Sequence, residues 1–253
     1  MESTIITQIR ERFRLETESL LTEQQLKNLT EDVRMENYLL RERKVARVEY
    51  DGSMKKMLDT FRGKKTERIE ELDRAIRQSE ANLQSRQRQL ECEKRRMAEL
   101  ETRISNLPDR RILREQAAGN PEAEREYARQ TALFCAFCLE PMLKDCLTAL
   151  EEQRRIVRGE RAGEIMSQRD RVGILAKPEE LAEKIYPILT ELKEALERTD
   201  QELTIGQFFT SPALFLNPAA AHNRIDRVSQ AIGQVERVRK EIISIGSKLE
   251  DKT

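Results

Sequence analysis

A single heptad pattern covers residues 69–107 and limits the possible folds more than any other feature of the sequence. The first core position of each of its six repeats is apolar, and these positions hold Ile69, Ile76, Leu83, Leu90, Met97 and Ile104. Apolar residues that alternate at three and four positions for this long place one face of a helix against a partner helix. At about 1.5 Å per residue, the contact line is roughly 60 Å long. We therefore expect part of the chain to form a long coiled coil.

The composition also favours long helices over a thick globular core. Charged residues make up 36% of the chain, aromatic residues make up 4%, and there is no Trp. Such a composition at helical spacing is typical of coiled coils, which bury only a narrow stripe. The 46 basic and 46 acidic side chains give a net charge of zero and are evenly mixed. This balance disfavours a nucleic-acid-binding protein, although residues 94–96 and 110–111 form short basic runs.

Breaks in the helical pattern divide the first part of the chain into two helices. Residues 4–50 contain neither Pro nor Gly, and the first strong break is Asp51-Gly52. We expect residues 4–50 to fold back antiparallel on residues 64–107, with the reversal inside 51–65. A β-hairpin at Asp51-Gly52 is disfavoured because its flanks keep a helical composition. The apolar residues of the first helix follow one frame up to Leu20 and a shifted frame from Leu26, which indicates a stutter or more than one packing neighbour.

The second part of the chain reads as a set of shorter helices. Asn120 and Pro121 predict the start of a helix that runs to about residue 170 and is ended by Gly173. Lys177-Pro178 predicts the start of the next helix, and Asn217-Pro218 the start of the last, with Ile225 facing inward. We expect the apolar segments 133–139 and 204–218, which hold five of the seven Phe residues, to meet.

Together these patterns predict an all-α protein with two domains. Residues 1–111 form a long antiparallel coiled-coil hairpin, the stalk, and residues 112–253 form a small helical bundle at its base. Within the stalk, three successive second-core positions are polar, and they hold Ser79, Arg86 and Glu93. We interpret Arg86 and Glu93 as interaction residues that fix the register, with an antiparallel partner supplying an acid and a base. The alternative is that both side chains extend to water.

No motif in the sequence carries a recognisable chemistry. Cys135 and Cys138 lie among apolar residues and lack the further ligands of a zinc site, so we interpret them as buried packing residues. His222 is the only histidine, which excludes a histidine cluster as a metal site. We therefore predict no catalytic residue, no metal and no cofactor, and we do not expect an enzyme.

The function that best fits this architecture is a non-enzymatic cytoplasmic scaffold or adaptor that binds a protein partner and forms homo-oligomers. Its interaction surfaces would be the flank of the stalk, the stalk tip near residues 51–63, or the apolar loop 208–216 with Phe208, Phe209 and Phe215. The alternative is a peripheral membrane-binding or membrane-remodelling protein. In it, the amphipathic N-terminal helix with Ile9 and Phe13 would lie on the membrane surface. We favour internal packing for that helix because acidic residues dilute its positive charge.

Overall fold

The computed structural model describes residues 2–61, 63–160, 167–212 and 224–250, and every regular element in them is a helix. This confirms the predicted all-α fold. The chain divides into two compact units. One is a hairpin unit of Arg14–Leu107, and the other is a bundle unit that combines Pro108–Thr253 with Met1–Phe13. The unit boundaries differ from the predicted domains of 1–111 and 112–253, because the first 13 residues pack with the bundle.

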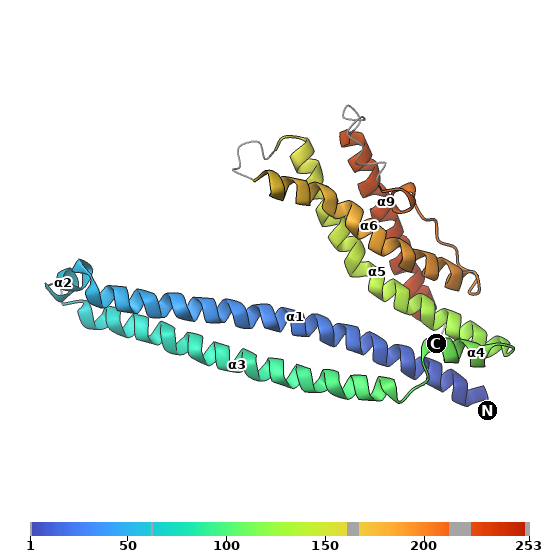
Figure 1. Ribbon diagram of the computed structural model, residues 1–253, viewed down its shortest axis with the longest axis horizontal. Coiled ribbons are helices and arrows are strands. Elements are labelled where there is room, and N and C mark those ends of the chain that lie inside the picture. Colours follow the sequence, from blue (N-terminus) through green and yellow to red (C-terminus); the bar gives the residue numbers. More distant parts are fainter. Residues whose placement is uncertain (1, 62, 161–166, 213–223, 251–253) are drawn as a thin grey trace. The chain divides into compact units, whose positions relative to one another are not determined.

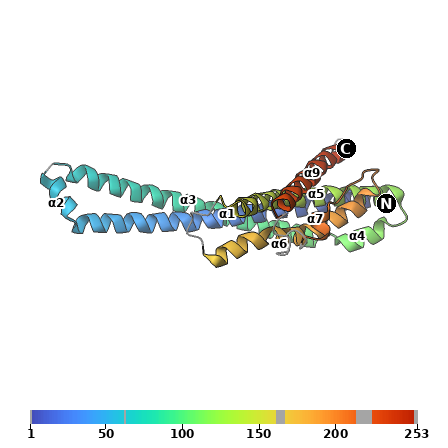
Figure 2. The same cartoon turned by 90° about the horizontal axis from the view of Figure 1, so that it is seen from above.

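The hairpin unit consists of two long helices and a short one. Helix α1 spans Glu2–Gly52, α2 spans Met54–Phe61 and α3 spans Lys65–Ser105. The portion of α1 in this unit and α3 run side by side in opposite directions, with α2 where the chain reverses (Figures 1 and 2). Two ion pairs match this antiparallel arrangement. Arg96 in the last part of α3 bonds Glu18 in the first part of α1 at 2.8 Å, and Asp73 in the first part of α3 bonds Arg47 in the last part of α1 at 2.9 Å. The hairpin therefore closes within one chain.

The predicted heptad positions of α3 form the face that is covered in the hairpin. Every first-core and second-core position from Ile69 to Leu107 is buried or half-buried, and Ser79 and Leu100 are fully buried. Most positions between them are exposed. We call the covered faces of α1 and α3 the seam. Its position on α3 confirms the prediction from the heptad pattern.

The seam on α1 is longer and more polar than the sequence pattern indicated. From Leu15 onward, the positions at alternating spacings of four and three are all buried or half-buried, namely Leu15, Ser19, Thr22, Leu26, Leu29, Val33, Glu36, Leu40, Arg43, Arg47 and Tyr50. The frame therefore does not shift between Leu20 and Leu26 as predicted, and Leu20 is 36% exposed. The apparent shift arises because Ile9 and Phe13, before this seam, belong to the core of the bundle unit.

The reversal between the long helices is built from capping interactions at both ends of α2. Ser53 precedes α2, and its Oγ accepts a hydrogen bond from the backbone N–H of Lys56 at 3.4 Å. After α2, the N–H of Lys64 donates to the Asp59 carbonyl and that of Gly63 to the Thr60 carbonyl, which is a Schellman motif. Gly63 has a φ of +68°, a conformation that glycine adopts without strain. We refer to residues 53–66 as the tip.

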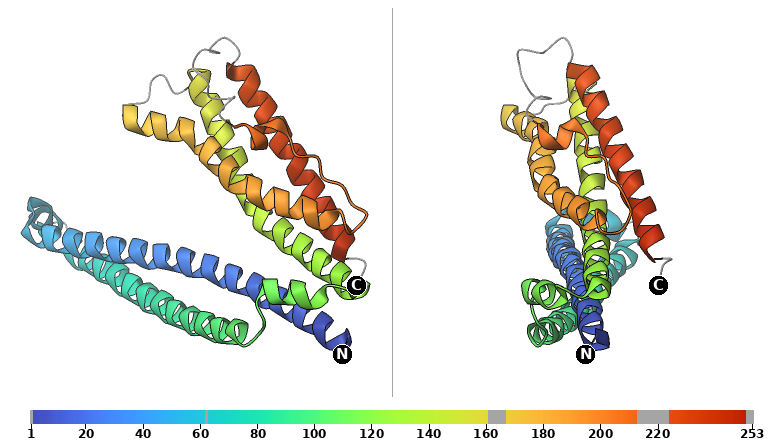
Figure 3. Two further views of the ribbon diagram at one scale, coloured as in Figure 1. Left: turned by 45° about the vertical axis from the view of Figure 1, so that its right-hand side comes forward. Right: turned by 90° about the vertical axis from the view of Figure 1, so that its right-hand side faces the viewer.

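The bundle unit packs three long helices around one apolar core. Helix α5 spans Pro121–Val157 and contacts both α6, Gln168–Leu196, and α9, Arg224–Glu250 (Figure 3). The described part of the unit also contains two short helices, α4 at Arg110–Ala117 and α7 at Gln207–Thr210. The predicted start of α5 is confirmed, because the Asn120 side chain accepts hydrogen bonds from the N–H groups of Glu122 and Ala123.

Three details of the bundle differ from the sequence prediction. Helix α5 ends at Val157 rather than near residue 170. Helix α6 begins at Gln168 rather than Lys177, because the hydroxyl of Ser167 caps it by accepting from the N–H of Asp170. Gly173 and Pro178 therefore lie inside α6 and do not separate two helices. In α9, Ile225 is 39% exposed rather than facing inward, whereas the neighbouring core position Val228 is fully buried.

Candidate functional site

Arg86, a predicted interaction residue, is bound within the hairpin itself. Its guanidinium forms an ion pair with Asp32 of α1, so the antiparallel partner helix supplies an acid as predicted. Both side chains stay more than one-third exposed, at 39% and 47%, so solvent screens the pair. The position of this pair on the seam is consistent with a role in register, which remains a prediction.

Glu93 does not receive its base from the partner helix. Its Oε2 lies 3.8 Å from Arg96 of the same helix, and Arg96 also binds Glu18 of α1. The hydrogen bond from Arg96 is the main cause that lowers the pKa of Glu18. Arg96 thus links one acid of α3 to one acid of α1. The expectation of a base supplied directly to Glu93 by α1 is wrong because this arginine lies one turn away on α3.

Two polar residues of α1 on the seam, Arg43 and Glu36, were not identified from the sequence. Ser79 is fully buried, and Arg43 of α1 donates hydrogen bonds to its Oγ and to the Ala75 carbonyl, the latter at 3.1 Å. Glu36 also lies on the seam, and its Oε2 is buried without a hydrogen-bond partner among the described residues. Long charged side chains can occupy seam positions because their aliphatic parts pack while their charged ends reach the rim. An apolar heptad search cannot detect such positions.

The apolar loop predicted to bind a partner contributes instead to the bundle core. Phe208 and Phe209 are almost fully buried, their rings pack edge to face with centroids 5.4 Å apart, and both belong to the core that includes Leu139. The N–H of Phe208 donates to the Gln234 side chain at 2.8 Å. These two residues are therefore not a surface in the folded chain, contrary to the prediction. Phe215 lies outside the described residues.

Of the two cysteines predicted to be buried packing residues, Cys135 is buried and Cys138 is half-buried. Cys135 and Cys146 are fully buried, and burial raises the pKa of the Cys146 thiol to about 12. Burial likewise raises the pKa of Cys135. Neither thiol is thus ionised near neutral pH, which disfavours nucleophilic or redox use. Among the described residues, no three potential metal ligands of the His, Cys, Asp or Glu types cluster, and His222 falls outside those residues.

The N-terminal amphipathic segment uses its apolar face inside the bundle unit. Ile9 and Phe13 are buried against Leu113 in a small second core. The Phe13 ring also packs edge to face on Phe134, and the guanidinium of Arg110 lies over both rings, at 4.5 and 3.9 Å from their centroids. Opening this core would be necessary before the segment could lie on a membrane.

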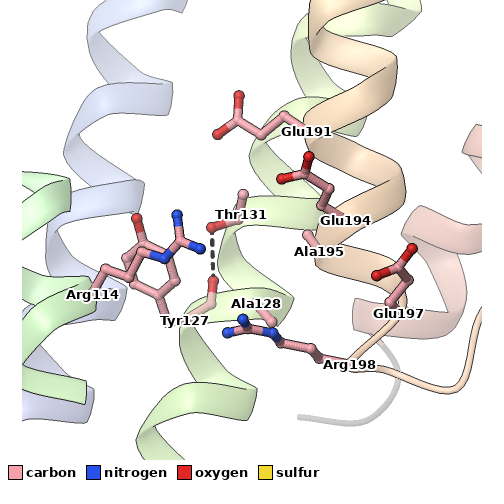
Figure 4. Close-up of a pocket in the computed structure, with 9 residues that line it drawn as sticks. All are labelled: Arg114, Tyr127, Ala128, Thr131, Glu191, Glu194, Ala195, Glu197 and Arg198. Atoms are coloured by element: carbon pink, nitrogen blue, oxygen red, sulfur yellow. Dashed lines mark hydrogen bonds between the residues drawn. The ribbon is translucent and has the colours of Figure 1, made fainter. Parts of the chain in front are cut away.

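One pocket in the described residues lies among α4, α5 and α6 (Figure 4). It has a volume of about 290 Å³, and its lining includes two arginines and three glutamates, namely Arg114, Arg198, Glu191, Glu194 and Glu197. Thr131 is part of the lining, but its hydroxyl donates to the Tyr127 carbonyl at 2.9 Å. The lining supplies no thiol, imidazole or serine hydroxyl. Its lining therefore offers acidic and basic side chains but no group that selects a substrate class.

Two surfaces of the hairpin unit expose large apolar side chains. The first, which we call the outer stripe, lies on α1 and consists of Leu21, Met35, Tyr38 and Val45, each about half exposed. The second, the tip face, lies on α2 and consists of Met54, Met57, Leu58 and Phe61, which are 56–88% exposed. Single exposed apolar residues are common, but groups that share one helical face mark interaction sites.

Searches against known protein families, curated proteins and solved structures find no significant match. Within the described ranges, no helix combines the length and the apolar character needed to cross a membrane. Function is therefore argued from the two exposed apolar surfaces of the hairpin.

Proposed function

We propose that the protein is a non-enzymatic coiled-coil scaffold that self-assembles by packing the outer stripe of α1 against a second copy. The observation that carries this proposal is the heptad spacing of the stripe. Met35, Tyr38 and Val45 are separated by three and seven residues, and Leu21 lies two heptads before Met35. These spacings are those of coiled-coil core positions. Their exposure in the hairpin leaves them available to a further helix.

The outer stripe and the seam occupy different faces of the same helix. The seam follows Val33, Leu40 and Arg47, whereas the stripe positions Met35 and Tyr38 are offset from it by two residues. An offset of two residues turns the side chain to roughly the far side of a helix. Helix α1 can therefore contact α3 on one face and another helix on the opposite face. This arrangement supports assembly of two hairpins into a four-helix structure.

The charges around the stripe are suited to a second copy as the partner. A shallow hollow is lined by Met35 and Tyr38 together with Glu31 and Arg34, one acid and one base, and all four side chains are exposed. Contact across a twofold axis places the same patch on both partners. In an antiparallel arrangement, the acid of one copy can approach the base of the other. A stripe bordered by charges of one sign would instead repel its copy.

The test is the molar mass of the full chain by light scattering coupled to size exclusion. We expect the wild type to have twice the 29.6 kDa mass of one chain, and the double variant Met35→Glu/Tyr38→Glu to elute as a monomer. The matched control is Ile243→Glu, which changes an apolar residue of α9 with 47% exposure and should leave the dimer intact. A wild-type monomer at all concentrations, or a double variant that remains dimeric, would refute the proposal.

The same surface also supports the adaptor role in which a helix of another protein occupies the stripe. We prefer a second copy as the partner because the residues beside the stripe include both an acid, Glu31, and a base, Arg34, so the patch can pair with itself. A cytoplasmic location remains a prediction from the sequence.

A further inference from the structure

We propose that the tip of the hairpin is a membrane-binding site that inserts the tip face of α2 into an anionic lipid surface. This site is separate from the outer stripe, and it would act whether or not the protein assembles through that stripe. It also differs from the membrane alternative based on the N-terminal helix, whose apolar residues are buried in the bundle unit.

The tip face has the geometry of an inserting helix. Met54, Met57, Leu58 and Phe61 follow the spacing i, i+3, i+4 and i+7, which places them on one side of α2. Phe61 is 88% exposed and Met54 is 80% exposed. The eight-residue helix α2 lies at the reversal of the hairpin (Figure 2), and its apolar face is exposed to solvent. Such a surface can enter a deformable lipid layer without a complementary cavity.

Local charge selects the kind of surface that the tip can approach. Residues 53–66 carry five basic side chains and one acidic side chain, although the chain as a whole is neutral. The acid, Asp59, accepts a hydrogen bond from the hydroxyl of Tyr50 at 2.9 Å, and Tyr50 is buried on the seam. Lys56 is paired with Asp51, whereas the basic pair Lys64-Lys65 lies directly after the reversal. The positive excess complements anionic headgroups, to which each Lys or Arg near the surface adds affinity.

The tip is held in its helical conformation before it meets a membrane. The Ser53 cap, the Schellman motif at Gly63 and the bond between Tyr50 and Asp59 fix both ends of α2. Binding therefore does not have to order this segment, which removes a cost that isolated amphipathic peptides incur. The combination of a fixed apolar face and a local positive excess favours a lipid surface over a second copy, because two equally basic tips would repel each other.

The absence of Trp from the chain allows a direct test on the full-length protein. In the variant Phe61→Trp, the only Trp of the chain lies on the tip face. In the matched control Tyr38→Trp, it lies on the outer stripe at a position that is 58% exposed. With vesicles that contain phosphatidylserine, we expect the Phe61→Trp emission to shift to the blue and to be quenched by brominated acyl chains. The emission of Tyr38→Trp should not change.

Two further variants separate the apolar and the charged contributions in a vesicle co-sedimentation assay. Met57→Ser/Phe61→Ser should weaken binding at least about tenfold, since it removes two large apolar side chains from the inserted face. Lys64→Gln/Lys65→Gln should weaken binding to anionic vesicles and should reduce its sensitivity to salt. The far-ultraviolet circular dichroism of both variants should match the wild type, because these positions lie outside either core.

Several results would overturn the proposal. One is an unshifted Phe61→Trp spectrum in the presence of anionic vesicles. Another is quenching of both Trp variants, which would place the contact along the flank. A blue shift of Phe61→Trp that depends on protein concentration and needs no vesicles would identify a second copy as the occupant. Equal binding to pure phosphatidylcholine vesicles would refute the role of the basic residues.

Discussion

Replacing Phe13 with Ala tests whether the first residues of the chain are held by the small second core of the bundle unit. The Phe13 ring is 2% exposed, packs edge to face on Tyr127 and Phe134 with centroids 5.7 and 6.0 Å away, and lies under the Arg110 guanidinium. Truncation of a buried Phe to Ala typically costs about 3–5 kcal/mol through lost burial and a cavity. We expect about 4 kcal/mol here, a large fraction of the roughly 5–15 kcal/mol that stabilises a typical domain.

The local consequence is measurable by native-state hydrogen exchange. If residues 4–13 open as one segment, a loss of about 4 kcal/mol accelerates amide exchange in this segment by roughly a thousandfold. The same variant should leave exchange near Leu83 in α3 unchanged, because that part of the chain belongs to the hairpin unit. Peptide-resolved mass spectrometry at neutral pH distinguishes the two regions.

Two matched variants define the result that refutes this reasoning. Phe137→Ala removes the same side chain from α5 at a position that is 36% exposed, and we expect it to cost less than about 1 kcal/mol. Phe13→Leu keeps most of the apolar volume and should cost about 1 kcal/mol. If Phe13→Ala exchanges no faster than Phe137→Ala in residues 4–13, the second core does not hold this segment.

Three further predictions concern acid stability, the seam and the thiols. Burial acts to raise the pKa of Glu126, but hydrogen bonds from Arg10 and Gln130 outweigh burial and lower that pKa below 4.5. The stability that the ionised Glu126 contributes should therefore be present above pH 4.5 and should be lost as the pH falls through the folded-state pKa. Glu126→Gln should therefore flatten the acid side of the melting temperature against pH. A double-mutant cycle between Asp32 and Arg86 should give a coupling below about 1 kcal/mol, because both side chains are partly exposed; a value of several kcal/mol would contradict this. A thiol reagent should label exposed Cys92 quickly and Cys146 only after unfolding, and rapid native labelling of Cys146 would show that its helix packing opens.

The sequence predicted the hairpin well where apolar residues mark the heptads. The first-core positions of α3, from Ile69 to Ile104, are all at least half-buried, and the end of that helix before Pro108 is confirmed. On α1 the same method failed, because Ser19 and Arg43 occupy seam positions without an apolar side chain. The seam continues through such residues because the aliphatic part of an arginine, or the small side chain of a serine, can pack against α3. Periodicity that counts only apolar residues therefore underestimates a polar coiled coil.

The prediction of interaction residues was less successful for a different physical reason. Phe208 and Phe209 lie in an apolar loop that was expected to meet segment 133–139 and was also a candidate binding surface, and the bundle core uses them. The stalk tip near residues 51–63 was among the predicted interaction surfaces, but its apolar face was not identified, although Met54 and Phe61 share a helical face and the tip carries a net positive charge. The equal totals of 46 basic and 46 acidic side chains over the whole chain conceal this local excess.

The backbone conformation at Gly63 also determines how many partners the hairpin can bind. The bonds of the seam, such as that between Arg47 and Asp73, join α1 to α3 and could in principle form between two exchanged chains. In this structure the left-handed φ at Gly63 ends α2, and α3 returns along its own α1 (Figure 2). Because the described seam is closed within one chain, the outer stripe and the tip face are the surfaces that would set the valency of the proposed assemblies.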